Sequence, residues 1–244
     1  MRLTLRDALG AVFILAMCAM CVRLGFWQLD RLDQRRARNA VVLAGMRQAP
    51  RPIDAALVAE MRRDPARLAY RRVVARGRYL PAAELVLRGR VEGGRPGVHL
   101  ATPLVLESGG ILIVNRGWVP AADAVTPAER PAPAAGTVAV EGILQEVPTT
   151  QDRGGRSVSA RGDTAYRRLD RGEAKARLGP EVLPMYLQVV GDTAGAARSF
   201  PVAVPPPPLD EGPHLGYAIQ WFSFALIGVV GLFVLLRRRG AAPS

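Results

Sequence analysis

His214 is one of two histidines in the chain, and it stands directly before a long uncharged segment, Leu215–Leu236. Aromatic, amide and cationic side chains lie near the same end of this segment and near the corresponding end of a second apolar segment. These residues are Tyr217, Gln220, Trp221, Trp27, Gln28 and Arg23. A haem at a membrane boundary requires an axial histidine, flat aromatic walls and a cation that pairs with propionate groups. The competing interpretation is an aromatic belt with a polar histidine among the lipid headgroups.

Arg23 lies inside the first apolar segment, where an ionisable side chain is costly enough to indicate a functional role. Only a short stretch separates it from the outer end of that segment near Leu29. The guanidinium could therefore also extend along the helix to the interface, which is common for arginine. The sequence is compatible with both interpretations.

Other kinds of chemistry find little support in the sequence. A serine hydrolase needs a histidine beside its nucleophile, but His99 lies in a strand-like run that favours a surface or packed histidine, and no GxSxG motif is present. The two histidines are far apart in sequence, and the region between the apolar segments has no cysteine to complete a zinc site. Cys18 and Cys21 lie within the first segment, where they favour a small, packable helix face. The sequence predicts a protein that is not an enzyme.

The formal net charge is +12, from 33 basic and 21 acidic residues. Such an excess favours anionic partners, including membrane lipid headgroups, carboxylate-bearing cofactors and acidic protein surfaces. Nucleic acid would suit the charge as well, but no helix-turn-helix, zinc or RNP-like pattern accompanies it. We therefore expect membrane lipid, and not nucleic acid, among the partners.

Two apolar segments are long enough to span a bilayer as helices, which needs about 20 residues. We predict transmembrane helices over residues 8–29, as an uncleaved signal anchor, and over residues 214–236. Basic residues precede the first and follow the second, and positive flanks remain in the cytoplasm. Residues 1–7 and 237–244 are therefore expected to be cytoplasmic, with the central domain on the opposite side of the membrane.

Residues 30–213 are predicted to form one extracytoplasmic domain that ends in a proline-rich linker over residues 201–213. Four-residue spacing of Ile53, Leu57 and Met61 predicts a helix over Ile53–Arg63, and Leu169–Leu178 is a second candidate. Two-residue periodicity predicts six strands: Tyr70–Tyr79, Glu84–Arg90, Val98–Leu106, Gly110–Val119, Thr137–Glu146 and Val182–Val190. Loops are expected at Pro120–Gly136 and Gln151–Asp163. The fold class is α+β, with two transmembrane helices flanking a mostly antiparallel, barrel-like β domain that contains one or two helices.

Three stretches resemble the signature motifs of the Surfeit-locus (Shy) family. They are LGFWQLDRL at Leu24–Leu32, VNRGWVP at Val114–Pro120 and HLGYAIQWF at His214–Phe222. Their order agrees with the family, and the resemblance covers nearly the whole chain. The first motif departs from the family where an aromatic residue and a lysine usually follow, because this chain has Asp33-Gln34-Arg35.

The resemblance implies a bacterial inner-membrane factor, not an enzyme, that helps to place haem a in the catalytic subunit of haem-copper cytochrome c oxidase. It implies a periplasmic central domain and, as partners, that subunit and the machinery of haem a synthesis. His214 would be the candidate ligand of the haem iron, and Trp27 and Gln28 the first-span motif. The domain motif, a candidate partner-binding site, would comprise Asn115, Arg116, Gly117 and Trp118.

The residues of the domain motif also permit a purely local interpretation. Gly117 allows a bulge or a close backbone approach, and a regular strand would place Arg116 and Trp118 on one side for cation–π stacking or partner contact. A structural turn that anchors the core is the alternative. At the level of the whole protein, the main alternative is a membrane scaffold that stabilises oxidase assembly intermediates without binding haem. A copper chaperone is disfavoured, because Cys and Met clusters are lacking outside the membrane segments.

Overall fold

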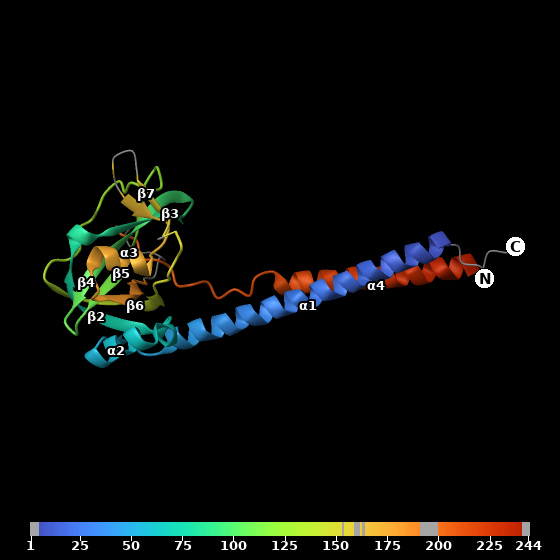
Figure 1. The fold of residues 1–244 in the computed structure, drawn as a ribbon, viewed down its shortest axis with the longest axis horizontal. Helices are drawn as coiled ribbons and strands as arrows, with labels where there is room; N and C mark the ends of the chain where they lie inside the picture. Colours follow the sequence, from blue (N-terminus) through green and yellow to red (C-terminus); the bar gives the residue numbers. More distant parts are fainter. Residues whose placement is uncertain (1–4, 153, 159–161, 163, 191–199, 241–244) are drawn as a thin grey trace. The chain divides into compact units, whose positions relative to one another are not determined.

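A computed structural model describes residues 5–152, 154–158, 162, 164–190 and 200–240 (Figure 1). The chain divides into two compact units. One comprises Met1–Val41 with Leu209–Ser244, and the other comprises Val42–Pro208. The first unit is helical and the second contains the β-sheet, as the sequence predicts.

The helical unit consists of most of α1 (Leu5–Arg47) and of α4 (His214–Gly240), which lie side by side (Figure 1). Both helices are long and apolar enough to cross a membrane, with candidate spans of Ala8–Arg47 and His214–Arg238. Small residues allow the two helices to approach closely, which is how membrane helices pack in the absence of a hydrophobic driving force.

The contact between these two helices involves the two cysteines. Cys18 and Cys21 are buried against Ala225, with Ile14 and Trp221 packed around them. A Cβ atom at Gly228 would lie only 2.5 Å from Cys18 Sγ, so glycine is required for this approach. The prediction of a small, packable face at the two cysteines is confirmed.

Helix α1 continues eighteen residues beyond Leu29, where the sequence predicted the extracytoplasmic domain to begin. Residues 30–47 contain no proline and are rich in Arg and Ala, which are good helix formers. Side chains on this extension bind the segment before α4. Arg35 Nε donates to the Asp210 carbonyl oxygen at 3.0 Å, Arg36 pairs with Glu211 at 2.8 Å and Asn39 Nδ2 donates to the Leu209 carbonyl oxygen at 2.9 Å. A hydropathy pattern misses this extension because its exposed faces are polar.

The second unit contains nine strands in the described residues. They are β1 (Arg51–Pro52), β2 (Arg72–Tyr79), β3 (Leu85–Glu92), β4 (Arg95–Leu106), β5 (Ile111–Pro120), β6 (Thr137–Glu146), β7 (Arg156–Val158), β8 (Thr164–Tyr166) and β9 (Val182–Gln188). The sheet order is β1-β2-β6-β9-β5-β4-β3-β8-β7, and β2 also pairs with β4. This extra pairing closes β2, β6, β9, β5 and β4 into a barrel-like ring. Most pairings are antiparallel; β1–β2, β3–β8 and β5–β9 are parallel.

The barrel interior and one covering helix form the main core. Helix α2 (Ala55–Arg63) is capped at its N-terminus by Asp54, whose carboxylate accepts a hydrogen bond from the Leu57 backbone N–H at 2.7 Å. Leu57 and Met61 are fully buried against residues of β2, β4, β5, β6 and β9. Each such burial contributes roughly 1.5–3 kcal/mol. Helix α3 (Arg171–Leu178) contributes Ala174 to a second cluster, and two 3-10 turns lie at Pro65–Leu68 and Pro81–Ala83.

The predicted fold class is confirmed, and the six predicted strands and two predicted helices agree with the structure to within three residues at every end. The predicted loop at Gln151–Asp163 is partly wrong, since β7 lies within it and pairs with β8. Strands of three residues are too short to show a two-residue periodicity. Residues 153, 159–161 and 163 of this segment lie outside the described residues.

The proline-rich linker predicted over residues 201–213 also begins differently. Val202 forms a β-bridge with Trp118, and Val204 forms one with Val190. We call Phe200–Val204 the strap. Because the strap is hydrogen-bonded to β5, the connection to α4 starts as part of the domain and not as a free spacer.

Candidate functional site

His214 and Gln28 are brought together in the helical unit. His214 begins α4, and its Nδ1 atom lies 2.9 Å from Oε1 of Gln28 on α1. An amide oxygen can only accept a hydrogen bond, so this contact places the imidazole proton on Nδ1. The lone pair of Nε2 is then available to a metal, in the arrangement by which proteins orient histidine ligands.

The sequence of α4 explains why His214 is directed at the other helix. Ala218 and Ala225 are buried, and Trp221 packs beside the cysteines of α1. With His214, these residues recur at intervals of four, three and four, which places them along one side of a helix. His214 therefore lies at the end of the stripe by which α4 contacts α1.

Among the described residues, no hydrogen bond or ring contact joins the other predicted site residues to His214. Trp221 is half-buried on the same stripe, two turns further along α4. Trp27 is 52% exposed, Tyr217 is 49% exposed, and Gln220 and Arg23 are also exposed. These four side chains belong to the outer surface of the helix pair, where an aromatic belt would place the rings. Haem binding at this set stays a prediction.

The domain motif VNRGWVP occupies β5 and forms a bulge. Leu100 of β4 is opposite Gly117 while Ala101 is opposite Asn115, so Arg116 is the additional residue. Gly117 has a φ of +128°, and a Cβ atom there would lie 2.1 Å from the carbonyl oxygen of Val202 in the strap. Glycine is required because the backbone adopts this angle and because the strap passes directly over it.

The bulge directs Arg116 into the domain. Its Nη1 atom lies 3.0 Å from Glu84 Oε2, and both side chains are only 9% exposed. The guanidinium also donates to the Pro131 carbonyl oxygen at 2.7 Å and lies over the Tyr79 ring. The regular strand that would align Arg116 with Trp118 is not present, and Trp118 instead packs with Phe200 under the guanidinium of Arg95.

Asn115 and Trp118 are each 4% exposed. The strap hydrogen-bonds to Trp118 in both directions, at 2.7 and 2.8 Å. These contacts favour the local interpretation of the motif, in which it anchors the core and the start of the connection to α4. Partner binding by Asn115, Arg116, Gly117 and Trp118 stays a prediction.

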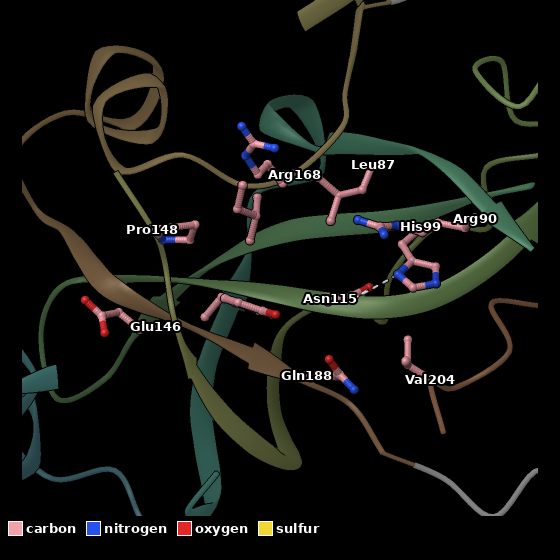
Figure 2. A pocket seen from close by; sticks show the side chains of 11 residues that line it. Leu87, Arg90, His99, Asn115, Glu146, Pro148, Arg168, Gln188 and Val204 are labelled. Carbon is pink, nitrogen blue, oxygen red and sulfur yellow. Dashed lines mark hydrogen bonds between the residues drawn. The ribbon is translucent and has the colours of Figure 1, made fainter. Parts of the chain in front are cut away.

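A cavity of about 440 Å³ lies in the domain beside the motif (Figure 2). His99 lines it, and its Nδ1 atom lies 3.2 Å from Nδ2 of Asn115. The sequence predicted a surface or packed histidine, but gave no indication of a cavity. The cavity depends on the register of β4 against β5, which a strand pattern alone does not reveal.

The pH dependence of stability should reveal the buried His99. Burial, assisted by the nearby positive charge of Arg90, lowers the pKa of His99 to about 3. The folded imidazole therefore stays neutral, while the unfolded one binds a proton below about pH 6.5, so stability falls as pH falls. We expect the free energy of unfolding of the domain to decrease by about 2 kcal/mol between pH 6.5 and 5, measured by thermal melting.

Substituting His99→Gln should flatten this slope, while His214→Ala, in the other unit, should leave it unchanged. Carboxylates contribute little in this window, because unfolded Asp and Glu have pKa values of about 4 and are mostly ionised above about pH 5 in both states. Asp123, for example, has its pKa lowered to about 2 by backbone N–H groups of Thr126 and Val125. An unchanged slope in His99→Gln would show that the imidazole is not held neutral by burial.

Two apolar helices of membrane-spanning length, flanking a barrel-like β domain, define a membrane protein with two candidate spans. The SURF1 family model matches residues 15–226, and the chain belongs to the SURF1 family, which is known for cytochrome oxidase assembly. An uncharacterised SURF1-like protein of Mycobacterium tuberculosis is 28% identical over 225 residues, covering 91% of this chain and 80% of that protein. A SURF1-like protein of Rickettsia felis is 26% identical, covering 92% and 95%. One of Caenorhabditis elegans is 25% identical, covering 89% and 71%.

Proposed function

We propose that this protein is an assembly factor, and not an enzyme, that assists delivery of haem a to the catalytic subunit of cytochrome c oxidase. Family membership supports a role in oxidase assembly. The observation that carries the haem part of the proposal is the contact between His214 Nδ1 and Gln28 Oε1 at 2.9 Å. It leaves Nε2 of a half-buried imidazole free at one end of an apolar helix pair.

The residues have distinct roles in this proposal. His214 Nε2 would ligate the iron, and Gln28 would hold the imidazole in the required tautomer and orientation. Tyr217, Trp221 and Trp27 would supply aromatic contacts, Gln220 a polar one, and Arg23 a cation for a propionate. Haem a, when bound, supplies an iron centre that accepts a nitrogen lone pair. A single histidine with an orienting amide suits temporary retention, because a delivery factor must release its cargo.

The proposed location is the bacterial inner membrane, with both termini in the cytoplasm and the domain in the periplasm. The basic residues Arg2 and Arg6 before the first span and Arg237–Arg239 after the second support this orientation. His214 and Gln28 would then lie near the periplasmic face. The proposed partners are the oxidase catalytic subunit, the machinery of haem a synthesis and membrane lipid, without nucleic acid.

A scaffold that binds oxidase subunits without contacting haem is the second candidate. It is favoured by the exposure of Trp27, Tyr217, Gln220 and Arg23 on the surface of the helix pair. Exposed aromatic side chains on membrane helices can also pack against helices of another membrane protein. The two candidates differ in whether the purified protein carries pigment.

The deciding experiment is purification from cells that produce haem a, together with oxidase activity in a strain that lacks the protein. Delivery of haem predicts a Soret band in the purified protein and restored oxidase activity upon re-expression. A colourless protein that restores oxidase activity would establish the scaffold. A strain with full oxidase activity in the absence of the protein would contradict both candidates.

A further inference from the structure

The cavity in the domain has the dimensions of a small-molecule site, and its lining combines polar and charged side chains with the apolar Leu87, Pro148, Leu169 and Val204. Its volume of about 440 Å³ lies within the range of roughly 300–1,000 Å³ typical of ligand pockets. Side chains from β3, β4, β5, β6 and β9 line it. Pro148 after β6, Arg168 and Leu169 between β8 and α3, and Val204 of the strap complete the lining. Figure 2 shows His99 and Arg90 at one side, with Glu146 and Pro148 at the opposite side. All of these residues belong to the domain, so the site is independent of His214.

Arg90 is a partly buried cation without a counterion among the described residues. Its Nη2 atom donates to the Arg167 carbonyl oxygen at 3.1 Å, while its Nε atom is buried without an acceptor in the described part of the chain. Burial lowers the pKa of Arg90, which reflects the cost of desolvating the charge. Arg168, which also lines the cavity, is by contrast paired with Asp152 at 2.8 Å. A buried charge without a partner is unfavourable, and an anionic ligand would compensate it.

His99 presents a hydrogen-bond donor beside this cation. Asn115 Oδ1 accepts from the Gly117 backbone N–H at 3.3 Å, which directs its Nδ2 atom to donate to His99 Nδ1. The neutral imidazole therefore carries its proton on Nε2, where it can donate to a ligand. The motif on β5 thus fixes the tautomer of a residue in the cavity.

A further donor lies on β9. Tyr186 donates its hydroxyl hydrogen to Gln145 Oε1 at 2.8 Å, and Gln145 Nε2 donates to Gln188 Oε1 at 2.8 Å. The Gln188 amide nitrogen is then left as a donor at the cavity. The opposite wall carries the carboxylate of Glu146, which pairs with Arg171 at 3.3 Å. The cavity therefore has a cation and hydrogen-bond donors at one side and a carboxylate at the opposite side.

We propose that this cavity binds a small organic monocarboxylate, with its carboxylate on Arg90, the Nε2–H of His99 and the Gln188 amide, and its apolar body against Leu87, Leu169 and Pro148. One guanidinium without a counterion in the described part of the domain matches a single negative charge, and its planar fork suits a carboxylate. The carboxylate of Glu146 disfavours a second negative charge at the other end. The apolar side chains of Leu87, Leu169 and Pro148 would be left without contacts by a ligand that is polar throughout, such as inorganic phosphate.

The proposal is tested with hexanoate as the probe and the full chain in lipid nanodiscs, using isothermal titration calorimetry. Hexanoate should bind saturably at one site, while hexanol and inorganic phosphate should bind at least tenfold more weakly. Arg90→Gln should weaken hexanoate binding about tenfold or more, because a charge-assisted hydrogen bond is lost. Arg72→Gln, which removes an exposed arginine of β2, is the matched control and should bind as the wild type does.

A second variant guards against misfolding of Arg90→Gln. Val204→Phe places a larger side chain on the strap, where it fills part of the cavity. It should abolish binding without removing any charge, and the circular dichroism spectrum should remain unchanged. Equal binding of hexanoate by wild type, Arg90→Gln and Val204→Phe would overturn the proposal, as would an absence of saturable binding to the wild type. Phosphate that binds as tightly as hexanoate would overturn the assignment to monocarboxylates. None of these outcomes depends on whether the protein carries haem.

Discussion

Substituting His214→Ala should remove the Soret band from protein purified out of cells that produce haem a. The substitution eliminates the only imidazole in the described part of the helical unit, and with it the proposed iron ligand. Gln28→Leu should have a graded effect, since it keeps the ligand but removes the acceptor that orients it at 2.9 Å. Loss of an orienting partner typically weakens metal affinity about 10–100-fold. Absorption spectra normalised to protein concentration measure both effects.

His99→Gln is the matched control, because it removes the other histidine of the chain from a site in the domain. It should leave the haem content unchanged. If His214→Ala retains the full Soret band, His214 is not the iron ligand. A spectrum lost equally in His99→Gln and His214→Ala would indicate a general effect on folding or expression, and would remove the support for a specific ligand.

Substituting Arg116→Met should lower the free energy of unfolding of the domain by about 3–5 kcal/mol, because Glu84 would remain as a buried and unpaired carboxylate. Both side chains are 9% exposed, and the guanidinium also satisfies the Pro131 carbonyl oxygen. In a domain of this size the change corresponds to a decrease in the melting temperature of roughly 6–20 °C. Thermal unfolding of the purified protein, followed by circular dichroism, measures it.

Two further variants distinguish the stability lost by breaking the buried ion pair from the stability lost by removing any arginine. Arg72→Gln breaks an exposed pair with Glu141 and should cost less than about 1 kcal/mol. Adding Glu84→Gln to Arg116→Met should recover part of the lost stability, because no buried charge then remains. If Arg116→Met melts as Arg72→Gln does but no longer captures oxidase subunits, Arg116 is a partner contact and its structural role is minor.

The sequence by itself determined the features that depend on neighbouring residues. An uncharged run at Leu215–Leu236 is sufficient to identify a span, because the bilayer requires only length and apolarity. The spacing of Ile53, Leu57 and Met61 located α2, and a two-residue period between Gly, Pro and Ser turns located the six longer strands. His214 and Gln28 were both identified as candidate site residues from their type and position, although not as a contacting pair.

Only the tertiary structure decided which distant residues meet. Gln28 and His214 are 186 residues apart, and their contact depends on how the two helices pack. The bulge at Arg116 turned this side chain toward Glu84 instead of aligning it with Trp118, and the register of β4 against β5 placed His99 beside Asn115. The burial of Arg90 without a counterion among the described residues likewise depends on how the strands and loops of the domain pack. Local patterns set the period of each element, whereas register, bulges and burial arise from contacts that no local window contains.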